Sequence, residues 1–403
     1  MQRRARKQFK ESISVPLAGG AAMPYEMNRS LPNPAYVSTA RPSPESAPLK
    51  IQSKRPWKKI IIRSCLSLLL LLILAGSWIG YKFIYNEVKV FGWSGIWSLI
   101  HPGPLNSQGG RVNILLAGDS VGRTDNGGGQ QLTDSIMLVS IDTQKHTAFL
   151  LSIPRDLWVK IPGFGYSKIN AAAEDGASDY SNNPSYDQNG MGLLEQVVSK
   201  NFGIPIDYYG LIDYAAFKDA VNAVGGITVN IQSNDPRGLY DASAAAPGNP
   251  QPLVELSNGV HTLDGQEALN LARARGDAFG SYGFAGSDFT RTQNQRMMML
   301  AIKDKVTSAG VLSNPFKLGQ LFDSFGNNVQ TDLSLGNARQ LYNISRGISN
   351  ANIASKGLNN INGHNLLTGY LTPDGEDALI PTTGVDNYSV IQAFVAQLTD
   401  NSQ

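Results

Sequence analysis

Three charged residues stand at the ends of predicted strands, where a sheet can gather them into one site. Asp119 directly follows the apolar run VNILLAG, Asp134 directly precedes SIMLVSID, and Arg155 lies just after HTAFLLSI. Open α/β sheets bind their ligands at such strand ends. Two carboxylates at neighbouring strand ends suit a hard cation such as Mg²⁺, which prefers oxygen ligands.

Arg155 and its neighbour Asp156 interrupt an otherwise apolar stretch, TAFLLSIPRDLWVKI at residues 147–161. Buried charge is costly unless a partner compensates it. We therefore expect Arg155 either to lie on a wet rim or to meet a charged ligand, with Asp156 bracing it.

A second group of charged residues lies on two predicted helices. Arg273 and Arg275 end the helical segment 263–275, and they can share a target only if the helix has unwound there. Arg291 and Gln295 project from one face of the helix 287–306, because they are four residues apart. The fork of arginine suits bidentate contacts to phosphate, although each arginine alone is also compatible with a surface ion pair.

Other chemistries have weaker support in the sequence. The four histidines are scattered and the single cysteine, Cys65, lies in an apolar run, so a zinc site is not expected. The glycine-rich stretch at 127–131 lacks the lysine of a phosphate-binding Walker loop. GDSVG at 118–122 matches the elbow of serine hydrolases, but a turn-rich segment follows Ser120 where that elbow needs a helix, so a Ser120–His364 hydrolase is only a minor alternative.

Alternating strands and helices must position these residues. Apolar, β-branched runs predict strands, and amphipathic segments predict helices between them. The strands are expected at 112–118, 135–142, 146–153, 207–213 and 227–231, and the helices at 168–176, 191–203, 214–226, 263–275, 287–306, 336–347 and 387–399. Gly203 is a predicted helix end, Asp264 and Glu267 a capping box, and Asp288 an N-cap. The pattern predicts an α/β domain in which helices cover a central mixed β-sheet.

The N-terminal part of the chain predicts a membrane anchor. Residues 1–59 carry a formal charge of +9 against +2 for the whole chain, and the span 60–85 is long and apolar enough to cross a bilayer. The basic segment should stay cytoplasmic by the positive-inside rule, so the rest of the chain would be extracellular. We expect a disordered segment at 1–59, a transmembrane helix at 60–85, a juxtamembrane linker at 86–110, a catalytic domain at 111–306 and its continuation at 307–403. Two polar inserts, 176–190 and 235–252, are expected as lids or loops.

The motifs at these positions resemble those of the LytR-CpsA-Psr family, whose members attach glycopolymers to the Gram-positive cell wall. The similarity runs through NILLAGDS, LTDSIMLVSID, LLSIPRD, KINAAAEDG, HTLDGQEALNLARAR and DFTRTQNQR to about residue 306. It implies a three-layer domain of this family's type. It also implies a phosphotransferase that moves a glycan-phosphate from a polyprenyl-pyrophosphate lipid to a peptidoglycan hydroxyl. A lipid bilayer is a further expected partner and nucleic acid is not.

The resemblance also assigns roles to individual residues. It implies that Asp119 and Asp134 hold Mg²⁺, with Mn²⁺ as an alternative. The implied pyrophosphate-binding residues are Arg155, Lys168, Arg273, Arg275, Arg291 and Gln295, and the implied catalytic residues are Asp119, Arg155, Asp288 and Arg291. Arg123 lies two residues later than the arginine of the family's first motif, which leaves its role open.

The same residues are compatible with two other functions. One is a non-catalytic binding or regulatory protein for lipid-linked precursors, and the other is a lipid-pyrophosphate hydrolase with water as the acceptor. The methionine-rich stretch 297–300 is a candidate lining for the lipid tail, with core packing as the alternative.

Overall fold

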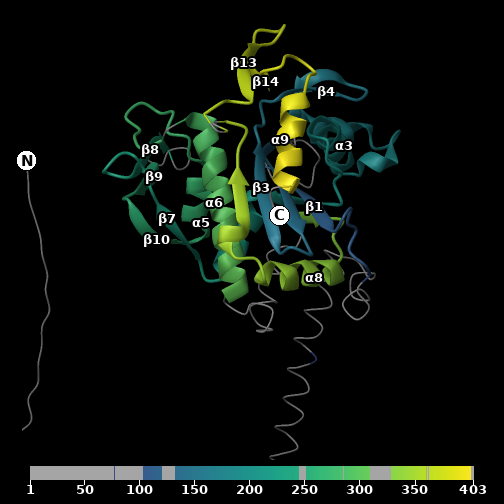
Figure 1. Ribbon diagram of the computed structural model, residues 1–403. Helices are drawn as coiled ribbons and strands as arrows, with labels where there is room; N and C mark the ends of the chain where they lie inside the picture. The colour runs from purple at the N-terminus through teal and green to yellow at the C-terminus, as the bar shows by residue number, and fades with distance from the viewer. Residues whose placement is uncertain are drawn as a thin grey trace, which may run out of the picture. The chain divides into compact units, whose positions relative to one another are not determined.

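A six-stranded mixed sheet forms the centre of the molecule in the computed structural model (Figure 1). The structure describes residues 77, 103–119, 132–244, 251–284, 286–308, 328–359, 361 and 363–400. The predicted segment 1–59 and, apart from Ser77, the predicted transmembrane helix lie outside these residues, as do Ser120 and Arg123. Across the described ranges, no helix has both the length and the apolar character to span a bilayer.

The sheet has the strand order β11-β6-β1-β2-β3-β12. Its strands are β1 (Arg111–Asp119), β2 (Thr133–Asp142), β3 (Thr147–Ile153), β6 (Tyr208–Asp213), β11 (Val329–Thr331) and β12 (Ile353–Lys356). The three central strands β1, β2 and β3 are antiparallel neighbours, whereas β6 runs parallel to β1 and β12 parallel to β3. The predicted strands at 112–118, 135–142, 146–153 and 207–213 are confirmed. Their near-continuous apolar sequence fits strands that are covered on both faces.

Helices cover both faces of this sheet, as predicted. On one face, Leu115, Leu138 and Leu151 pack against α3 (Met191–Phe202) and α9 (Ser389–Asp400). On the other face lie α6 (Ser287–Ser308) and α8 (Leu335–Arg346) (Figure 1). The left-handed Gly203 ends α3 as predicted, because its N–H bonds the carbonyl of Ser199 while its φ is 68°.

A smaller core lies beside the sheet, with two two-stranded sheets. Its elements are α4 (Tyr214–Ala223), β7 (Ile227–Ile231), β8 (Leu239–Ala244), β9 (Pro252–Leu256), β10 (Gly259–Leu263) and α5 (Gly265–Arg273). The two sheets are β7–β10 and the hairpin β8–β9. Val221, Ile227 and Leu271 are fully buried there and pack with Met298 of α6. The capping box of Asp264 and Glu267 at the start of α5 is confirmed. The described part of the second polar insert therefore forms β8 and the start of β9, whereas its residues 245–250 lie outside the described ranges.

The remaining elements complete the periphery. They are β4 (Trp158–Ile161), β5 (Gly165–Lys168), η1 (Ile169–Ala171), α2 (Ala172–Asp179), η2 (Pro184–Tyr186), η4 (Asn350–Asn352), β13 (Leu367–Leu371) and β14 (Asp377–Pro381). The segment predicted as one helix at 168–176 is thus a 3₁₀ turn followed by α2. The first polar insert, 176–190, holds the end of α2 and η2. Residues beyond 306 supply both edge strands of the sheet, β11 and β12.

Candidate functional site

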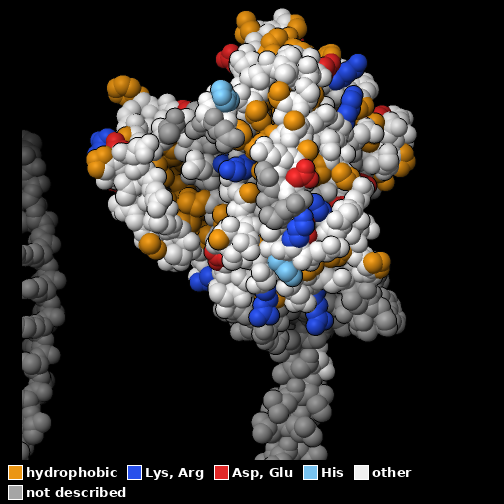
Figure 2. Space-filling view, viewed as in Figure 1, with side chains coloured by type: hydrophobic (Ala, Val, Ile, Leu, Met, Phe, Trp, Pro, Cys, Tyr) orange, Lys and Arg blue, Asp and Glu red, His pale blue; other side chains and the backbone are white. Residues whose placement is uncertain are grey.

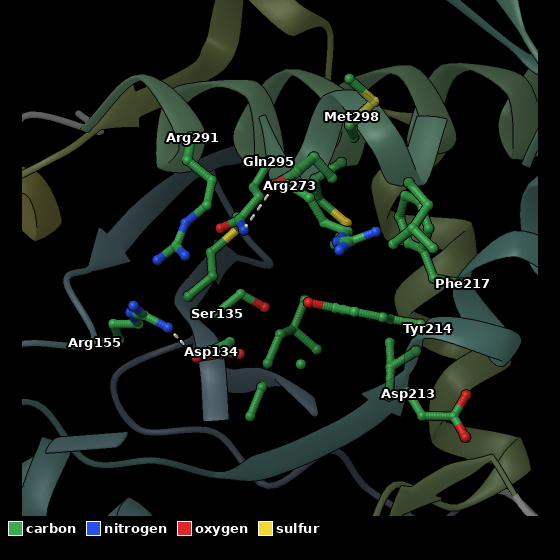
Figure 3. Close-up of a pocket in the computed structure, with 18 of the residues that line it drawn as sticks. Asp134, Ser135, Arg155, Asp213, Tyr214, Phe217, Arg273, Arg291, Gln295 and Met298 are labelled. Carbon is green, nitrogen blue, oxygen red and sulfur yellow. Dashed lines mark hydrogen bonds and ion pairs between the residues drawn. The ribbon is translucent and has the colours of Figure 1, made fainter. Parts of the chain in front are cut away.

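A cavity of about 310 Å³ opens between the ends of β1, β2 and β6 and the helices α4, α5 and α6 (Figure 3). One set of lining residues is polar: Asp134, Ser135, Arg155, Asp213, Tyr214, Arg273, Arg275, Arg291 and Gln295. The other set is small or apolar: Leu116, Ala117, Gly118, Met137, Ile212, Phe217, Leu269, Ala272, Met298, Met299 and Ile302. Four arginines and two aspartates give the lining a net charge of +2, so the cavity favours an anion that also carries an apolar part.

A β-bulge at the start of β2 brings Asp134 into the cavity. Gly118 pairs with Ser135, but Asp119 pairs with Thr133, so Asp134 is the extra residue between the two pairs. Bulges bend a strand and re-aim side chains near functional sites. The absence of a Cβ at Gly118 matters here, because a Cβ would lie 2.3 Å from the Ser135 hydroxyl oxygen. As a result, Asp134 and Ser135 both line the cavity.

Arg155 lies just beyond β3 and forms ion pairs with two aspartates. Its Nη1 donates to the Asp134 carboxylate (Figure 3). Its Nε lies 3.7 Å from Asp156 Oδ2. Partial burial disfavours the charge, but the hydrogen bond that Arg155 donates to Asp134 and the charges of both aspartates outweigh it and raise the pKa of Arg155. The predicted bracing by Asp156 is therefore present. Arg155 Nε is buried and has no hydrogen-bond partner, so a donor remains for a ligand.

The end of α5 presents Arg273 and Arg275 to the same cavity. The helix stops at Arg273, and Ala274 is extended with φ −64° and ψ 132°. The unwinding that the sequence required is thus observed, and both arginines line the cavity although they are only two residues apart. The guanidinium of Arg273 lies 5.5 Å from the ring centre of Tyr214, and Arg275 Nη2 lies 3.6 Å from Asp288 Oδ1.

Arg291 is the most deeply buried of the four arginines, with a side-chain exposure of 6%. Its Nη2 is engaged by Asp288 Oδ1 at 2.5 Å, whereas its Nε has no hydrogen-bond partner. Burial lowers the pKa of Arg291, and the nearby cations Arg275 and Arg155 add to this effect against the attraction of Asp288. A buried cation whose Nε donor has no partner is suited to bind an anion.

Asp288 was predicted as an N-cap, and this prediction is wrong. Helix α6 begins at Ser287, so Asp288 lies inside the first turn. There its carboxylate is stabilised by the positive end of the helix and by its ion pairs with Arg275 and Arg291. Asp288 thus couples the two arginines rather than capping the helix.

Gln295 lines the cavity but its amide is also used within the protein. Its Nε2 donates to the carbonyl oxygen of Ala272 at 3.2 Å, and the neighbouring Asn294 donates to that of Leu271 at 3.3 Å. These two side chains satisfy carbonyl groups in the last turn of α5, which have no partner within the helix. Gln295 therefore holds the helix end that carries Arg273 (Figure 3).

Three predicted site residues do not line the cavity: Asp119, Lys168 and Asp288, of which Asp288 contacts it only through its ion pairs with Arg275 and Arg291. Lys168 ends β5, where its Nζ lies 3.0 Å from Glu376 and 3.8 Å from Asp156. It reaches the site only indirectly, because Asp156 also pairs with Arg155. Asp119 is the last residue of β1 and is 4% exposed, but it is not among the lining residues.

Sequence reasoning missed Tyr214 and Ser135, which both point into the cavity (Figure 3). Tyr214 is the first residue of α4, at the junction between strand β6 and the helix. Burial and the nearby Asp134 raise the pKa of Tyr214, so the phenol stays protonated and can donate a hydrogen bond. Its position directly after a predicted strand was the available signal. Asp213 lines the same region, but its carboxylate points away from the arginines and caps α4 (Figure 3).

The donors present fit a hard divalent cation. Mg²⁺ is usually held by one or two carboxylates together with substrate phosphates. Asp134 offers a carboxylate inside the cavity, and Asp119 ends the adjacent strand opposite Thr133. Among the residues that the structure describes, no three His, Cys, Asp or Glu side chains form a metal-binding group. A cation here would thus depend on ligand oxygens as well as on the protein.

Comparisons with known proteins identify the family of the chain. The LytR_cpsA_psr family model matches residues 99–378. The chain is 33% identical over 213 residues to the polyisoprenyl-teichoic acid–peptidoglycan teichoic acid transferase TagT of Bacillus subtilis (strain 168), which covers 53% of this chain and 57% of the relative. It is 33% identical over 240 residues to the corresponding transferase TagU of Oceanobacillus iheyensis, covering 59% of this chain and 64% of the relative. The chain thus spans about three fifths of the length of these relatives.

The fold has solved counterparts. The structure of TagT bound to LI-WTA superposes with a TM-score of 0.53 at 26% identity, covering 74% of this chain and 94% of that one. That coverage includes most of the solved chain, so the arrangement of helices on a mixed sheet is common to both proteins.

Proposed function

Because the chain belongs to the LytR-CpsA-Psr family, we propose that it transfers a glycan-phosphate from a polyprenyl-pyrophosphate lipid to a peptidoglycan hydroxyl. One observation carries this proposal. Four arginines from three separate elements line the polar end of a cavity whose remaining lining is largely apolar. A lipid pyrophosphate combines a doubly charged head with an apolar tail, and the cavity has complementary parts for both. The names of the related transferases support the same reaction class.

Arginine forks hold the pyrophosphate in this proposal. Arg291 Nε and Arg155 Nε are buried donors without hydrogen-bond partners, and phosphate oxygens would satisfy them. Phosphoryl transfer depends mainly on positioning and on stabilisation of charge, so these contacts supply what the reaction needs. Asp134 and Asp288 hold the arginines between turnovers and limit their mutual repulsion.

The bond changes follow from this placement. The oxygen of the acceptor hydroxyl forms a bond to the phosphorus that carries the glycan. The bond between that phosphorus and the bridging oxygen breaks, its electron pair leaves with polyprenyl phosphate, and the hydroxyl proton is released. Arg273, Arg275 and Arg291 stabilise the charge that develops on the leaving phosphate. Mg²⁺ or Mn²⁺ held by Asp134 and Asp119 would supply further charge neutralisation.

The apolar lining receives the first part of the lipid tail. Met298 and Met299 line the cavity, whereas Met297 and Leu300 line a separate groove. Only two residues of the stretch 297–300 can therefore contact a lipid tail in the cavity. An anchored chain with a cytoplasmic N-terminus and an extracellular catalytic domain would keep this cavity near the bilayer that holds the donor. This topology rests on the apolar span 60–85.

A direct assay separates the candidate functions. The full chain, purified in detergent, is incubated with a synthetic polyprenyl-pyrophosphate sugar, peptidoglycan oligosaccharide and Mg²⁺, and the products are identified by mass spectrometry. A phosphodiester-linked product together with polyprenyl phosphate is the expected result. Free glycan phosphate would instead identify a hydrolase, and tight donor binding with no products in the presence of Mg²⁺ would identify a binding protein. A reaction that proceeds unchanged in excess chelator would overturn the role of the cation.

A further inference from the structure

A buried aspartate outside the cavity holds the turn that carries Arg275. Asp241 lies on β8, within the second polar insert, and is only 1% exposed. Its Oδ2 accepts hydrogen bonds from the backbone N–H groups of Arg275 and Gly276, both at 2.9 Å. Its Oδ1 accepts a third bond from the backbone N–H of Ser243 at 3.0 Å. One carboxylate thus connects the hairpin to the segment just beyond α5.

These contacts leave the Arg275 side chain available. Within the ranges that the structure describes, no lysine, arginine or histidine lies within ion-pair distance of Asp241, which is bound by backbone N–H groups instead. Burial works against its charge, but those hydrogen bonds outweigh it and lower the pKa of Asp241. The carboxylate therefore stays ionised at neutral pH and accepts hydrogen bonds from the main chain. The Arg275 guanidinium lies near Asp288 instead.

The turn is held from its other side as well. Asn294 and Gln295 of α6 donate to carbonyl groups of the last turn of α5, just before Arg273. Gly276 has a φ of 72°, and a Cβ there would lie 2.5 Å from the Phe284 ring, so this turn has little freedom to rearrange. Side chains of α6 thus bind carbonyl groups at the end of α5, and Asp241 of β8 binds the N–H groups just beyond it. Together they restrict the backbone from Arg273 to Arg275 to one conformation.

We propose that Asp241 is a positioning residue that fixes Arg275 for the pyrophosphate, and that the β8–β9 hairpin is therefore part of the catalytic architecture. This inference rests on the proposed function for its catalytic consequence, but the restraint on the turn can be measured independently. It gives the second insert a role that its polar, loop-like sequence does not reveal.

The test compares four forms of the full chain: wild type, Asp241→Asn, Arg275→Ala and the double variant. An asparagine has one acceptor oxygen, so its amide group must face at least one of the N–H groups that the carboxylate now binds. We expect Asp241→Asn to lower the transfer rate roughly 10- to 100-fold, as small misplacements of binding groups do. The double variant should be no slower than Arg275→Ala by more than about threefold, because coupled residues give non-additive effects.

Two further measurements separate positioning from general destabilisation. Amide hydrogen exchange of residues 274–286 should speed up in Asp241→Asn while exchange of α3 stays unchanged. Asp235→Asn is the matched control, because Asp235 precedes the same hairpin and pairs only with the exposed Arg237 among the ion pairs described. It should leave the transfer rate within about twofold of wild type.

The outcomes are decisive in each direction. Additive losses in the double variant, unchanged exchange in the 274–286 turn, or an equal loss in Asp235→Asn would each overturn the assignment. If wild type transfers nothing, the proposed function fails, and the same four forms titrated with inorganic pyrophosphate still test Asp241. In that titration the coupling between Asp241 and Arg275 should persist in the dissociation constants.

Discussion

Replacing Arg291 by lysine isolates the value of its forked guanidinium. Lysine keeps the positive charge beside Asp288 but offers a single flexible ammonium in place of the planar fork. In Arg291, Nη2 is paired with Asp288, whereas the buried Nε lacks a hydrogen-bond partner, and we assign Nε to a phosphate oxygen. The lysine ammonium can keep the ion pair with Asp288 but has no donor at the position of Nε, so the variant loses about one hydrogen bond to a charged group.

The magnitude follows from that count. A hydrogen bond to a charged group contributes about 1.5–3 kcal/mol. Since about 1.4 kcal/mol corresponds to a factor of ten, Arg291→Lys should weaken binding of polyprenyl pyrophosphate roughly 10- to 150-fold. A calorimetric titration of the purified chain with polyprenyl pyrophosphate measures the dissociation constant directly. The remaining charge should keep Asp288 paired, so the fold should be preserved.

Arg296 provides a matched control on the same helix. It is buried to a similar extent, at 7% exposure against 5% for Arg291. Its guanidinium donates to Ser152 and Ser355 rather than facing the cavity. Arg296→Lys should therefore reduce the free energy of unfolding but change the dissociation constant by no more than about twofold, as expected for independent sites. Equal affinities of wild type and Arg291→Lys, or an equal loss in Arg296→Lys, would refute the reasoning.

Three further predictions concern the bulge, the lysine and a buried acid. Gly118→Ala should weaken donor binding, because the new Cβ would clash with the Ser135 hydroxyl. The double variant Gly118→Ala/Ser135→Ala removes that hydroxyl and should regain part of the affinity. A double variant that binds the donor no better than Gly118→Ala would refute the clash. Arg155→Ala should cost roughly 2–5 kcal/mol of donor binding, as for a buried charged contact, whereas Lys168→Ala should cost no more than about 1 kcal/mol; equal losses in titration would place Lys168 in the site. Burial and two nearby aspartates raise the pKa of Glu195 to about 8, so the native state retains a proton that the unfolded state releases above pH 4.5. The free energy of unfolding should therefore fall between pH 5 and 8 by roughly 3–4 kcal/mol more in wild type than in Glu195→Gln, as measured by urea titration. Parallel pH profiles would contradict this.

Local sequence patterns were sufficient to predict the central strands and much of the site. The apolar runs of β1, β2 and β3 are long enough to identify without partners, and the capping box before α5 is encoded within four residues. Arg273 and Arg275 were predicted to share a target only if the helix had unwound there, and this condition is met because α5 ends at Arg273, two residues before the predicted end at 275. All four arginines line one cavity, as the sequence suggested.

Features that depend on distant residues could not be predicted. The partner of Lys168 is Glu376, more than two hundred positions later, and nothing near Lys168 in sequence indicates this pairing. The bulge that re-aims Asp134 arises from the register of β1 against β2, which composition does not encode. The hairpin of the second insert also lacked a clear signal, since Asp241 acquires its role only by meeting the backbone beyond α5.

Both outer strands of the central sheet come from the last third of the chain. β11 pairs with β6 at one edge of the sheet and β12 pairs with β3 at the other, where Ile353 lies opposite Ala148. Contacts between such distant residues form late, because a long loop must close first. Until residues 328–356 have been added, β3 and β6 would present unpaired main-chain groups, which readily recruit strands from other molecules. A chain truncated ahead of residue 328 should therefore tend to aggregate even though every arginine of the cavity is present.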